Sequence, residues 1–165
     1  MPHAFSTQRL TLRPLGPQDA PSIARFVGDL DVARWLTRVP HPYGIEDAHA
    51  FIERSAGDEF TYAVIAQSTF AGVMSITDEL GYWLGQPFWG RGYATEAANA
   101  LVSRYFDAWD DDIQSGFVLG NSASRNVLEK LGFAPLDRRE VASVSLGDTV
   151  TVQKMRLTRA AWEDM

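Results

Sequence analysis

Two glycines, Gly90 and Gly92, stand one residue apart directly before a helical run, in the segment WGRGYATEA at residues 89–97. Because glycine has no Cβ, such a loop can bend sharply and bring a large group close to its backbone N–H groups. A helix N-terminus adds unpaired N–H donors and a dipole equivalent to roughly +0.5 charge. The segment therefore predicts a seat for a phosphate or diphosphate.

The residues of this loop leave other interpretations open. A dinucleotide fingerprint needs a third glycine where Thr95 stands, and a nucleotide P-loop needs Gly-Lys-Ser or Gly-Lys-Thr at its end. The sequence differs from both patterns, which disfavours them. A tight strand-to-helix turn without a ligand is the simplest interpretation of an isolated Gly-x-Gly pair, so a second signal is needed.

A second segment, NSASRNVLEKLGF at residues 121–133, carries its own helix start and stop signals. Asn121 or Ser122 can cap the helix, and Gly132 stands where a left-handed residue commonly follows the last turn. Phe133 can then fold back onto that turn, as the Schellman pattern expects. The segment predicts a short helix that is fixed at both ends.

Ser124 lies near the start of that helix and shares a face with Leu128 and Leu131, which follow at spacings of four and seven residues. Its hydroxyl is therefore expected to point into the molecule. A serine at this place can also be an ordinary helix-start residue, and the isolated segment favours that simpler role.

The elements that must position these residues follow from apolar periodicity. Strands are expected over residues 7–13, 60–67, 70–77, 80–84 and 113–119, with a final hairpin over 138–157. The strands at 60–67 and 70–77 are separated only by Ser68 and Thr69, which predicts a hairpin. Helices are expected after a capping Asp19, within 29–43, over 46–54, after the glycine loop and over 121–132. This order implies one mixed sheet with helices packed on it.

Composition limits the classes of protein that fit. At 165 residues the chain is expected to form a single domain, 1–165, since domains hold roughly 100 to 200 residues. The absence of cysteine excludes disulfides and thiolate chemistry, and the three scattered histidines predict no metal site. A net charge of −6 argues against nucleic acid and anionic lipid as partners, and no apolar stretch approaches the roughly 18 residues of a membrane span. We therefore expect a cytoplasmic protein.

Four segments together resemble one family. The glycine loop resembles the acetyl-CoA pyrophosphate-binding motif of the GNAT superfamily of N-acetyltransferases. Asn121-x-x-Ser124 followed by EKLGF resembles the later motif of its ribosomal-protein-alanine (Rim-type) branch. The opening TQRLTLRP at 7–14 and the strand LGYWL at 80–84 are similar to that branch as well. The segments span nearly the whole chain in the family's order and spacing.

The resemblance implies a fold and a coenzyme site. The fold is an α+β (mixed α/β) GNAT fold, with a central, mixed but mostly antiparallel twisted sheet of about seven strands and helices on both faces. The coenzyme, acetyl-CoA, would lie where the strands 80–84 and 113–119 splay apart. Its binding residues would be Leu84, Phe88, Trp89, Gly90, Arg91, Gly92, Tyr93, Ala94, Thr95, Asn121, Ser124 and Arg125.

One position departs from the family pattern. The superfamily motif commonly begins with Gln or Arg three residues before the first glycine, whereas here Pro87 stands there and Gln86 lies one place earlier. The phosphate contacts of the motif are mostly made by backbone groups. They survive this change, and a role for Gln86 does not follow.

The resemblance also implies a direct transfer of the acetyl group to a primary amine. A backbone N–H near Leu84 would stabilise the oxyanion, Ser124 would protonate the leaving thiolate, and Tyr82 is a further catalytic candidate on the same strand. Glu79, just before that strand, is the candidate general base, although it can equally be a solvated carboxylate.

The expected acceptor is a protein N-terminal α-amine of the ribosomal-protein-alanine type. A small-molecule amine such as a polyamine, an aminoglycoside or an amino-acid derivative is an alternative, and so is a CoA-binding sensor module without turnover. The acceptor pocket is expected between the loop 35–43 and the hairpin 138–151. A monomer and a homodimer are both compatible with the sequence.

Overall fold

The structure is a computed structural model that describes residues 3–165. Along the chain the elements are β1 (Phe5–Ser6), β2 (Leu10–Arg13), the 3-10 helix η1 (Pro17–Asp19), α1 (Ala20–Val27), α2 (Leu30–Ala33), α3 (Ile45–Ser55), β3 (Thr61–Ala66), β4 (Thr69–Ile76), β5 (Leu80–Leu84), the 3-10 helix η2 (Gln86–Phe88), α4 (Tyr93–Ala108), β6 (Ile113–Val118), α5 (Ser122–Leu131), β7 (Ala134–Ser143), β8 (Asp148–Leu157) and α6 (Arg159–Glu163). No helix within this range is both long and apolar enough to cross a bilayer.

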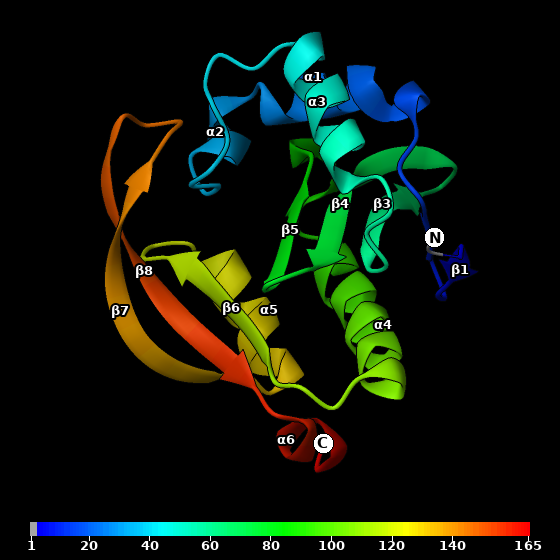
Figure 1. Ribbon diagram of the computed structural model, residues 1–165, viewed down its shortest axis with the longest axis vertical. Coiled ribbons are helices and arrows are strands. Elements are labelled where there is room, and N and C mark those ends of the chain that lie inside the picture. Colours follow the sequence, from blue (N-terminus) through cyan, green and yellow to red (C-terminus); the bar gives the residue numbers. More distant parts are fainter. Residues whose placement is uncertain (1–2) are drawn as a thin grey trace.

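The first sheet has five antiparallel strands in the order β1-β2-β3-β4-β5, with helices on both faces (Figure 1). Alternation along β3 explains this arrangement, since successive side chains point to opposite faces. Tyr62 and Val64 are buried in the core that includes α4, whereas Ala63 is buried in a second core with α1 and α3. The helices on the two faces therefore rest on alternate residues of the same strands.

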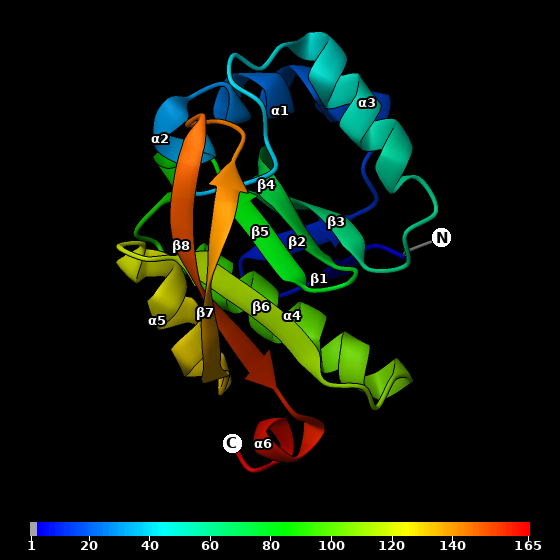
Figure 2. The same ribbon diagram turned by 60° about the vertical axis from the view of Figure 1, so that its left-hand side comes forward.

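The second sheet has three antiparallel strands in the order β6-β8-β7. Strand β6 lies beside β5 but forms no backbone ladder with it, so the expected single sheet is divided in two (Figure 2). The described residues form eight strands instead of about seven, because the short strand at Phe5–Ser6 extends the first sheet. The predicted α+β architecture is otherwise confirmed, and the predicted splay between residues 80–84 and 113–119 is the boundary between the sheets.

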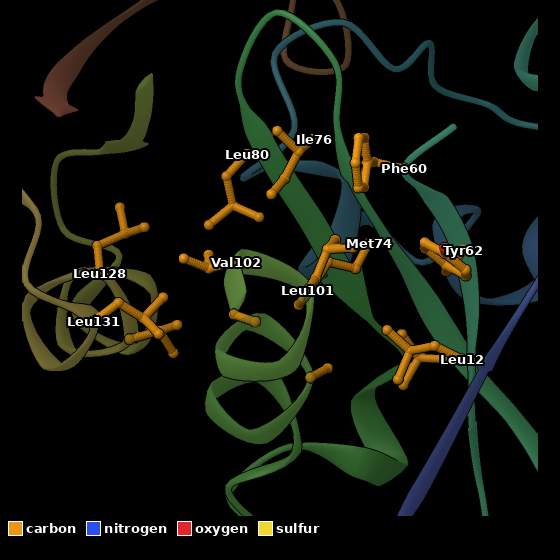
Figure 3. Packing of buried hydrophobic residues seen from close by; sticks show 14 of the residues in the cluster. Leu12, Phe60, Tyr62, Met74, Ile76, Leu80, Leu101, Val102, Leu128 and Leu131 are labelled. Carbon is orange, nitrogen blue, oxygen red and sulfur yellow. The ribbon is translucent and has the colours of Figure 1, made fainter. Parts of the chain in front are cut away.

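One core joins the two sheets through α4 and α5. Leu101 of α4 packs beside Met74 of the first sheet, while Leu128 and Leu131 of α5 approach α4 from its other side (Figure 3). Leu101 and Leu128 are fully buried. Since burying such a side chain contributes about 1.5–3 kcal/mol, these contacts fix α4 and α5 relative to β5 and β6.

The start of α1 corrects one expectation. Contrary to the prediction, the carboxylate of Asp19 makes no capping bond to α1; it accepts hydrogen bonds from Arg13 at 2.7 and 2.9 Å and from the Gly16 N–H, before η1, at 3.0 Å. Asp19 is only 2% exposed, and a buried carboxylate is strongly destabilising without a cation. The hydrogen bond to Asp19 also raises the pKa of Arg13. The helix begins where predicted, and Asp19 at its start forms an ion pair with Arg13.

Candidate active site

A cavity of about 590 Å³ lies between β5 and β6. Strand β5 is the outer strand of the first sheet and β6 is the outer strand of the second. The remaining walls come from the glycine loop, the first turn of α5 and the loop after α2. Most of the predicted site residues line this cavity: Glu79, Tyr82, Leu84, Phe88, Trp89, Gly90, Gly92, Tyr93, Ala94, Thr95, Asn121 and Ser124.

The register of β5 directs backbone groups of Tyr82 and Leu84 into this cleft. Gly85 donates its N–H to the carbonyl of Ala71 at 2.8 Å, and Leu84 stands opposite Gly72. In an antiparallel pair, positions alternate between those that bond to the partner and those that point away. Leu84 and Tyr82 therefore turn their N–H and C=O groups away from β4 and toward β6.

Two side-chain bonds confirm this direction at the ends of β5. The carbonyl of Leu80 accepts a hydrogen bond from Ser115 Oγ on β6 at 2.7 Å, which closes one end of the cleft. At the other end the carbonyl of Leu84 accepts one from the indole N–H of Trp89 at 2.8 Å. Between them, the cleft side of β5 presents main-chain groups to which an extended ligand can add like a further strand.

The glycine loop adopts the conformation that its composition predicts. Gly90 and Gly92 have φ of 72° and 79°, in the left-handed region that strains other residues. Gly92 is the residue directly before α4, so the helix N-terminus opens from the loop as expected. A Cβ at Gly90 would meet nothing within 4 Å, which leaves open space in front of the backbone.

The start and end of α5 also follow the prediction. Of the two capping candidates, Asn121 is the one that acts, since its Oδ1 accepts the N–H of Ser124 at 3.2 Å. Gly132 is left-handed with φ of 98°, and Phe133 donates its N–H to the carbonyl of Leu128 at 3.1 Å. This Schellman motif closes the last turn of the helix.

Ser124 and Tyr82 meet inside the cleft. The serine Oγ and the phenol oxygen lie 3.0 Å apart, joining α5 to β5 by a hydrogen bond. Burial raises the pKa of Tyr82, and the bond to Ser124 acts in the opposite direction. The phenol therefore stays protonated at neutral pH and can donate to Ser124 Oγ, which leaves the serine proton free for a group bound in the cleft.

Glu79 faces the cleft but is not free. Lys154 Nζ of β8 lies 2.7 Å from Glu79 Oε2, and the lysine side chain is only 15% exposed. Lys154 stands opposite Gly116 in the β6–β8 pair, and a Cβ at Gly116 would lie 3.6 Å from the lysine Cδ. The lysine stem thus passes beside a residue without a side chain to reach a carboxylate of the other sheet.

Asp78, the neighbouring carboxylate on the cleft wall, is also engaged. The hydroxyl of Thr77 donates to it at 3.0 Å, and Arg38 lies 3.8 Å away. Its pKa lies below the ordinary value, chiefly because of the bond from Thr77, with Arg38 adding to the effect. Both carboxylates of the β4–β5 turn are therefore engaged by partners, Glu79 by Lys154 and Asp78 by Thr77 and Arg38.

Two of the predicted coenzyme contacts do not line the cavity. The side chain of Arg91 is exposed, and its backbone carbonyl accepts a hydrogen bond from Arg9. Arg125 is exposed on α5 and pairs with Glu129 at 2.8 Å. Either side chain would have to turn toward the loop to meet a phosphate, so these two assignments stay predictions.

The wall opposite the strands comes from the loop after α2. Residues 35–39 of this loop line the cavity, whereas residues 40–43 and 138–151, which were also expected to form the acceptor pocket, do not. Trp35 lies with its ring 3.9 Å from the position of a Cβ at Gly120. The tip of the β7–β8 hairpin is tied to this loop: Val144 donates its N–H to Thr37 O at 2.9 Å and Ser145 its hydroxyl to Ala33 O at 3.0 Å. The hairpin tip thereby holds in place the loop that forms this wall, without lining the cavity itself.

Three residues of the site were missed by sequence reasoning. Lys154, Ser115 and Arg9 each act across large sequence separations, on Glu79, Leu80 and Arg91 respectively. Lys154 and Ser115 lie within strands, where a polar residue normally signals a solvent-facing position. Only the opening segment TQRLTLRP, already noted for its family resemblance, contained a signal for Arg9.

Comparison with known proteins covers most of the chain. A sequence profile described as "Acetyltransferase (GNAT) domain" matches residues 9–134. YdaF of Bacillus subtilis (strain 168), provisionally named a ribosomal N-acetyltransferase, is 24% identical over 143 residues, covering 76% of this chain and 78% of YdaF. The uncharacterized N-acetyltransferase p20 of Bacillus licheniformis is 26% identical over 143 residues, covering 77% of this chain and 80% of p20.

Solved structures share the architecture. A GNAT-family acetyltransferase from Bacillus anthracis aligns with a TM-score of 0.82 at 19% identity, over 94% of this chain and 98% of that one. RimL, a ribosomal L7/L12 alpha-N-protein acetyltransferase solved with coenzyme A, aligns with a TM-score of 0.80 at 20% identity, over 96% of this chain and 99% of RimL. MccE, a microcin C7 self immunity acetyltransferase solved with acetyl-CoA and AMP, aligns with a TM-score of 0.79 at 20% identity, over 92% of this chain and 93% of MccE. At these identities the likeness establishes the fold.

Proposed function

The chain belongs to the GNAT family of acetyl-CoA-dependent acetyltransferases, and we propose that its acceptor is a protein N-terminal α-amine. Relatives of the fold carry this activity in their names: RimL is described as a ribosomal L7/L12 alpha-N-protein acetyltransferase, and a Vibrio fischeri protein as a ribosomal-protein-S5-alanine acetyltransferase. These names suggest the substrate class, and the residues of the cleft supply a physical reason for it.

The observation that carries the proposal is that both carboxylates at the β4–β5 turn are paired. Glu79 is bound to Lys154 and Asp78 to Thr77 and Arg38. An attacking amine must be neutral, and at pH 7.5 roughly a third of α-amines but only about one lysine side chain in a thousand are neutral. A site without a free carboxylate base is therefore better suited to an α-amine.

The coenzyme site that we propose follows the predicted residues. The backbone of residues 88–95 and the N-terminus of α4 would hold the diphosphate, because they offer N–H donors beside open space. The main-chain groups of Tyr82 and Leu84 that face the cleft would pair with the extended arm of the coenzyme. Asn121 would act indirectly, by fixing the first turn of α5.

The proposed reaction needs three contributions from the chain. The amine nitrogen attacks the thioester carbonyl, and the Leu84 N–H stabilises the oxyanion, an effect typically worth about 2.7–4 kcal/mol. As the C–N bond forms and the C–S bond breaks, Ser124 gives its proton to the sulfur and regains one from Tyr82, which in turn takes a proton from water. The proton released by the amine passes to water or, when its pair with Lys154 opens, to Glu79.

A panel of acceptors tests the proposal. Peptides with free Ala, Ser or Met N-termini are compared with the same peptides carrying a blocked N-terminus and an internal lysine, and with polyamines and aminoglycosides. We expect thiol release from acetyl-CoA with the free N-termini, and mass spectrometry should place one acetyl group on the α-amine. Preferred acetylation of the lysine peptides or small amines would replace the proposed acceptor, and no amine-dependent turnover would indicate a CoA sensor.

A further inference from the structure

We propose that Arg9 is a positioning residue that holds the glycine loop in the form that binds the coenzyme diphosphate. Arg9 lies in the turn between β1 and β2, 82 residues before Arg91, yet its Nη1 donates a hydrogen bond to the Arg91 carbonyl at 2.8 Å. The proposal rests on the use of acetyl-CoA by this family and not on the identity of the acceptor.

The bond acts on the residue between the two left-handed glycines. A peptide unit is planar and trans, so the carbonyl of Arg91 and the N–H of Gly92 point in opposite directions. Holding the carbonyl against Arg9 therefore fixes the direction of the Gly92 N–H, away from Arg9. Without that bond the glycines on either side are free to rotate, because each has access to both signs of φ.

Arg9 is itself held at the first turn of α4. Its Nε donates to Glu96 Oε1 at 2.7 Å and its backbone N–H donates to Glu96 Oε2 at 2.8 Å. Thr7 donates its hydroxyl to the same carboxylate, and the guanidinium lies over the Tyr93 ring at 4.8 Å. Three contacts with α4, together with the Thr7 bond that holds Glu96, therefore fix the orientation in which Nη1 meets the loop.

The charges at this corner also matter. Glu96 lies near the start of α4, where its charge is stabilised by the helix dipole but repels a diphosphate. Arg9 neutralises Glu96, and its Nη2 lies 3.3 Å from the position of a Cβ at Gly92, beside the loop. Arg9 thus prevents the carboxylate from weakening the anion site.

A comparison of donors with and without the diphosphate separates this role of Arg9 from a purely structural one. The variants are Arg9→Ala, Arg9→Lys and, as a matched control, Arg104→Ala. The control removes an arginine of α4 that lies over Phe5 of β1 at 4.3 Å. The dissociation constant for CoA is measured by calorimetry, and kcat and KM are compared for acetyl-CoA and S-acetylpantetheine, a donor that ends before the diphosphate.

We expect Arg9→Ala to weaken CoA binding and raise the KM for acetyl-CoA by about tenfold or more, with kcat little changed, since charge-assisted hydrogen bonds are lost. The kcat and KM of Arg9→Ala with S-acetylpantetheine should be unchanged. Arg9→Lys should show an intermediate loss of CoA affinity, and Arg104→Ala should bind CoA as tightly as the unmodified protein. Unchanged CoA affinity in folded Arg9→Ala would overturn the proposal, and so would an equal loss for both donors. If Arg9→Ala does not fold, the same comparison is made with Arg9→Lys. A raised KM for acetyl-CoA with unchanged kinetics for S-acetylpantetheine would support the proposal, and an equal effect on both donors would overturn it.

Discussion

Ser124 Oγ lies 3.0 Å from the phenol oxygen of Tyr82, so one hydrogen bond joins the first turn of α5 to the strand whose free backbone groups face the cleft. The two hydroxyls come from different sides of the cleft, and each orients the other. A group that enters between β5 and β6 meets this pair. Ser124, the proton donor of the proposed reaction, is therefore hydrogen-bonded to a second hydroxyl, that of Tyr82, which can replace the proton that it gives.

Replacing Ser124 with alanine should lower kcat by about a hundredfold and leave the KM for acetyl-CoA within a factor of about three, since positioned proton transfer contributes roughly 10²–10⁴. Tyr82→Phe should have a smaller effect, because water can reprotonate the serine. Steady-state kinetics with the best acceptor measure both. Ser122→Ala, on the same helix turn, is the control, and a kcat for Ser124→Ala equal to that of this control would rule out the assignment.

Gly92→Val should abolish the stabilisation of the protein by acetyl-CoA in thermal melts. The substitution forces a β-branched residue into φ of 79° and places its side chain against Arg9, whose Nη2 lies 3.3 Å from the Cβ position and whose guanidinium holds the loop. In the unmodified protein, ligand at a hundred times its dissociation constant should add roughly 2.7 kcal/mol. Gly57→Val, at φ of 90° in the loop before β3, carries the same kind of strain away from the cleft and should keep the full ligand effect. Retained protection in Gly92→Val would count against the loop as the diphosphate site.

Lys154→Met should raise kcat/KM with the best acceptor if Glu79 accepts the amine proton. The substitution removes the ammonium group that lies 2.7 Å from Glu79 Oε2, so the carboxylate becomes free to bond to the amine. Adding Glu79→Gln should remove that gain. The same kcat/KM in all three proteins would assign the proton to water.

The carboxylate of Glu96 should contribute stability that depends on pH. Its pKa is lowered because the hydrogen bonds from Thr7 and Arg9 together outweigh the opposing effect of burial. A lowered folded-state pKa means that this stability is complete above the unfolded value, about 4.3, and is lost as pH falls through the lower folded value. Urea unfolding between pH 7 and pH 3 should therefore show a shallower acid loss for Glu96→Gln than for the unmodified protein. Exposed Glu53→Gln is the control, and parallel curves for Glu96→Gln and this control would refute the prediction.

Signals that act within a few residues predicted local structure well. The capping role of Asn121, the left-handed Gly132 and the inward direction of Ser124 all follow from residue type and helical spacing. The β3–β4 turn lies one residue before its predicted place, because Gln67 and Ser68 take positive φ of 52° and 63°. Residues other than glycine seldom adopt that conformation, so their types did not indicate it.

Relationships between distant segments could not be predicted in the same way. The ion pair of Lys154 with Glu79 and the bond of Arg9 to Arg91 span 75 and 82 residues. No periodicity encodes such pairs, since they exist only once the two sheets have packed on α4 and α5. For the same reason the sequence predicted that β5 and β6 splay apart, but it did not predict that they belong to two separate sheets.

Where the two sheets meet at the closed end of the cleft, the Ser115 hydroxyl bond to Leu80 takes the place of a main-chain ladder. Separating the walls there would break this bond and the ion pair of Lys154 with Glu79, and would leave every strand pair of both sheets intact. At this end of the cleft the two sheets are therefore joined through side chains, without a main-chain hydrogen bond between strands.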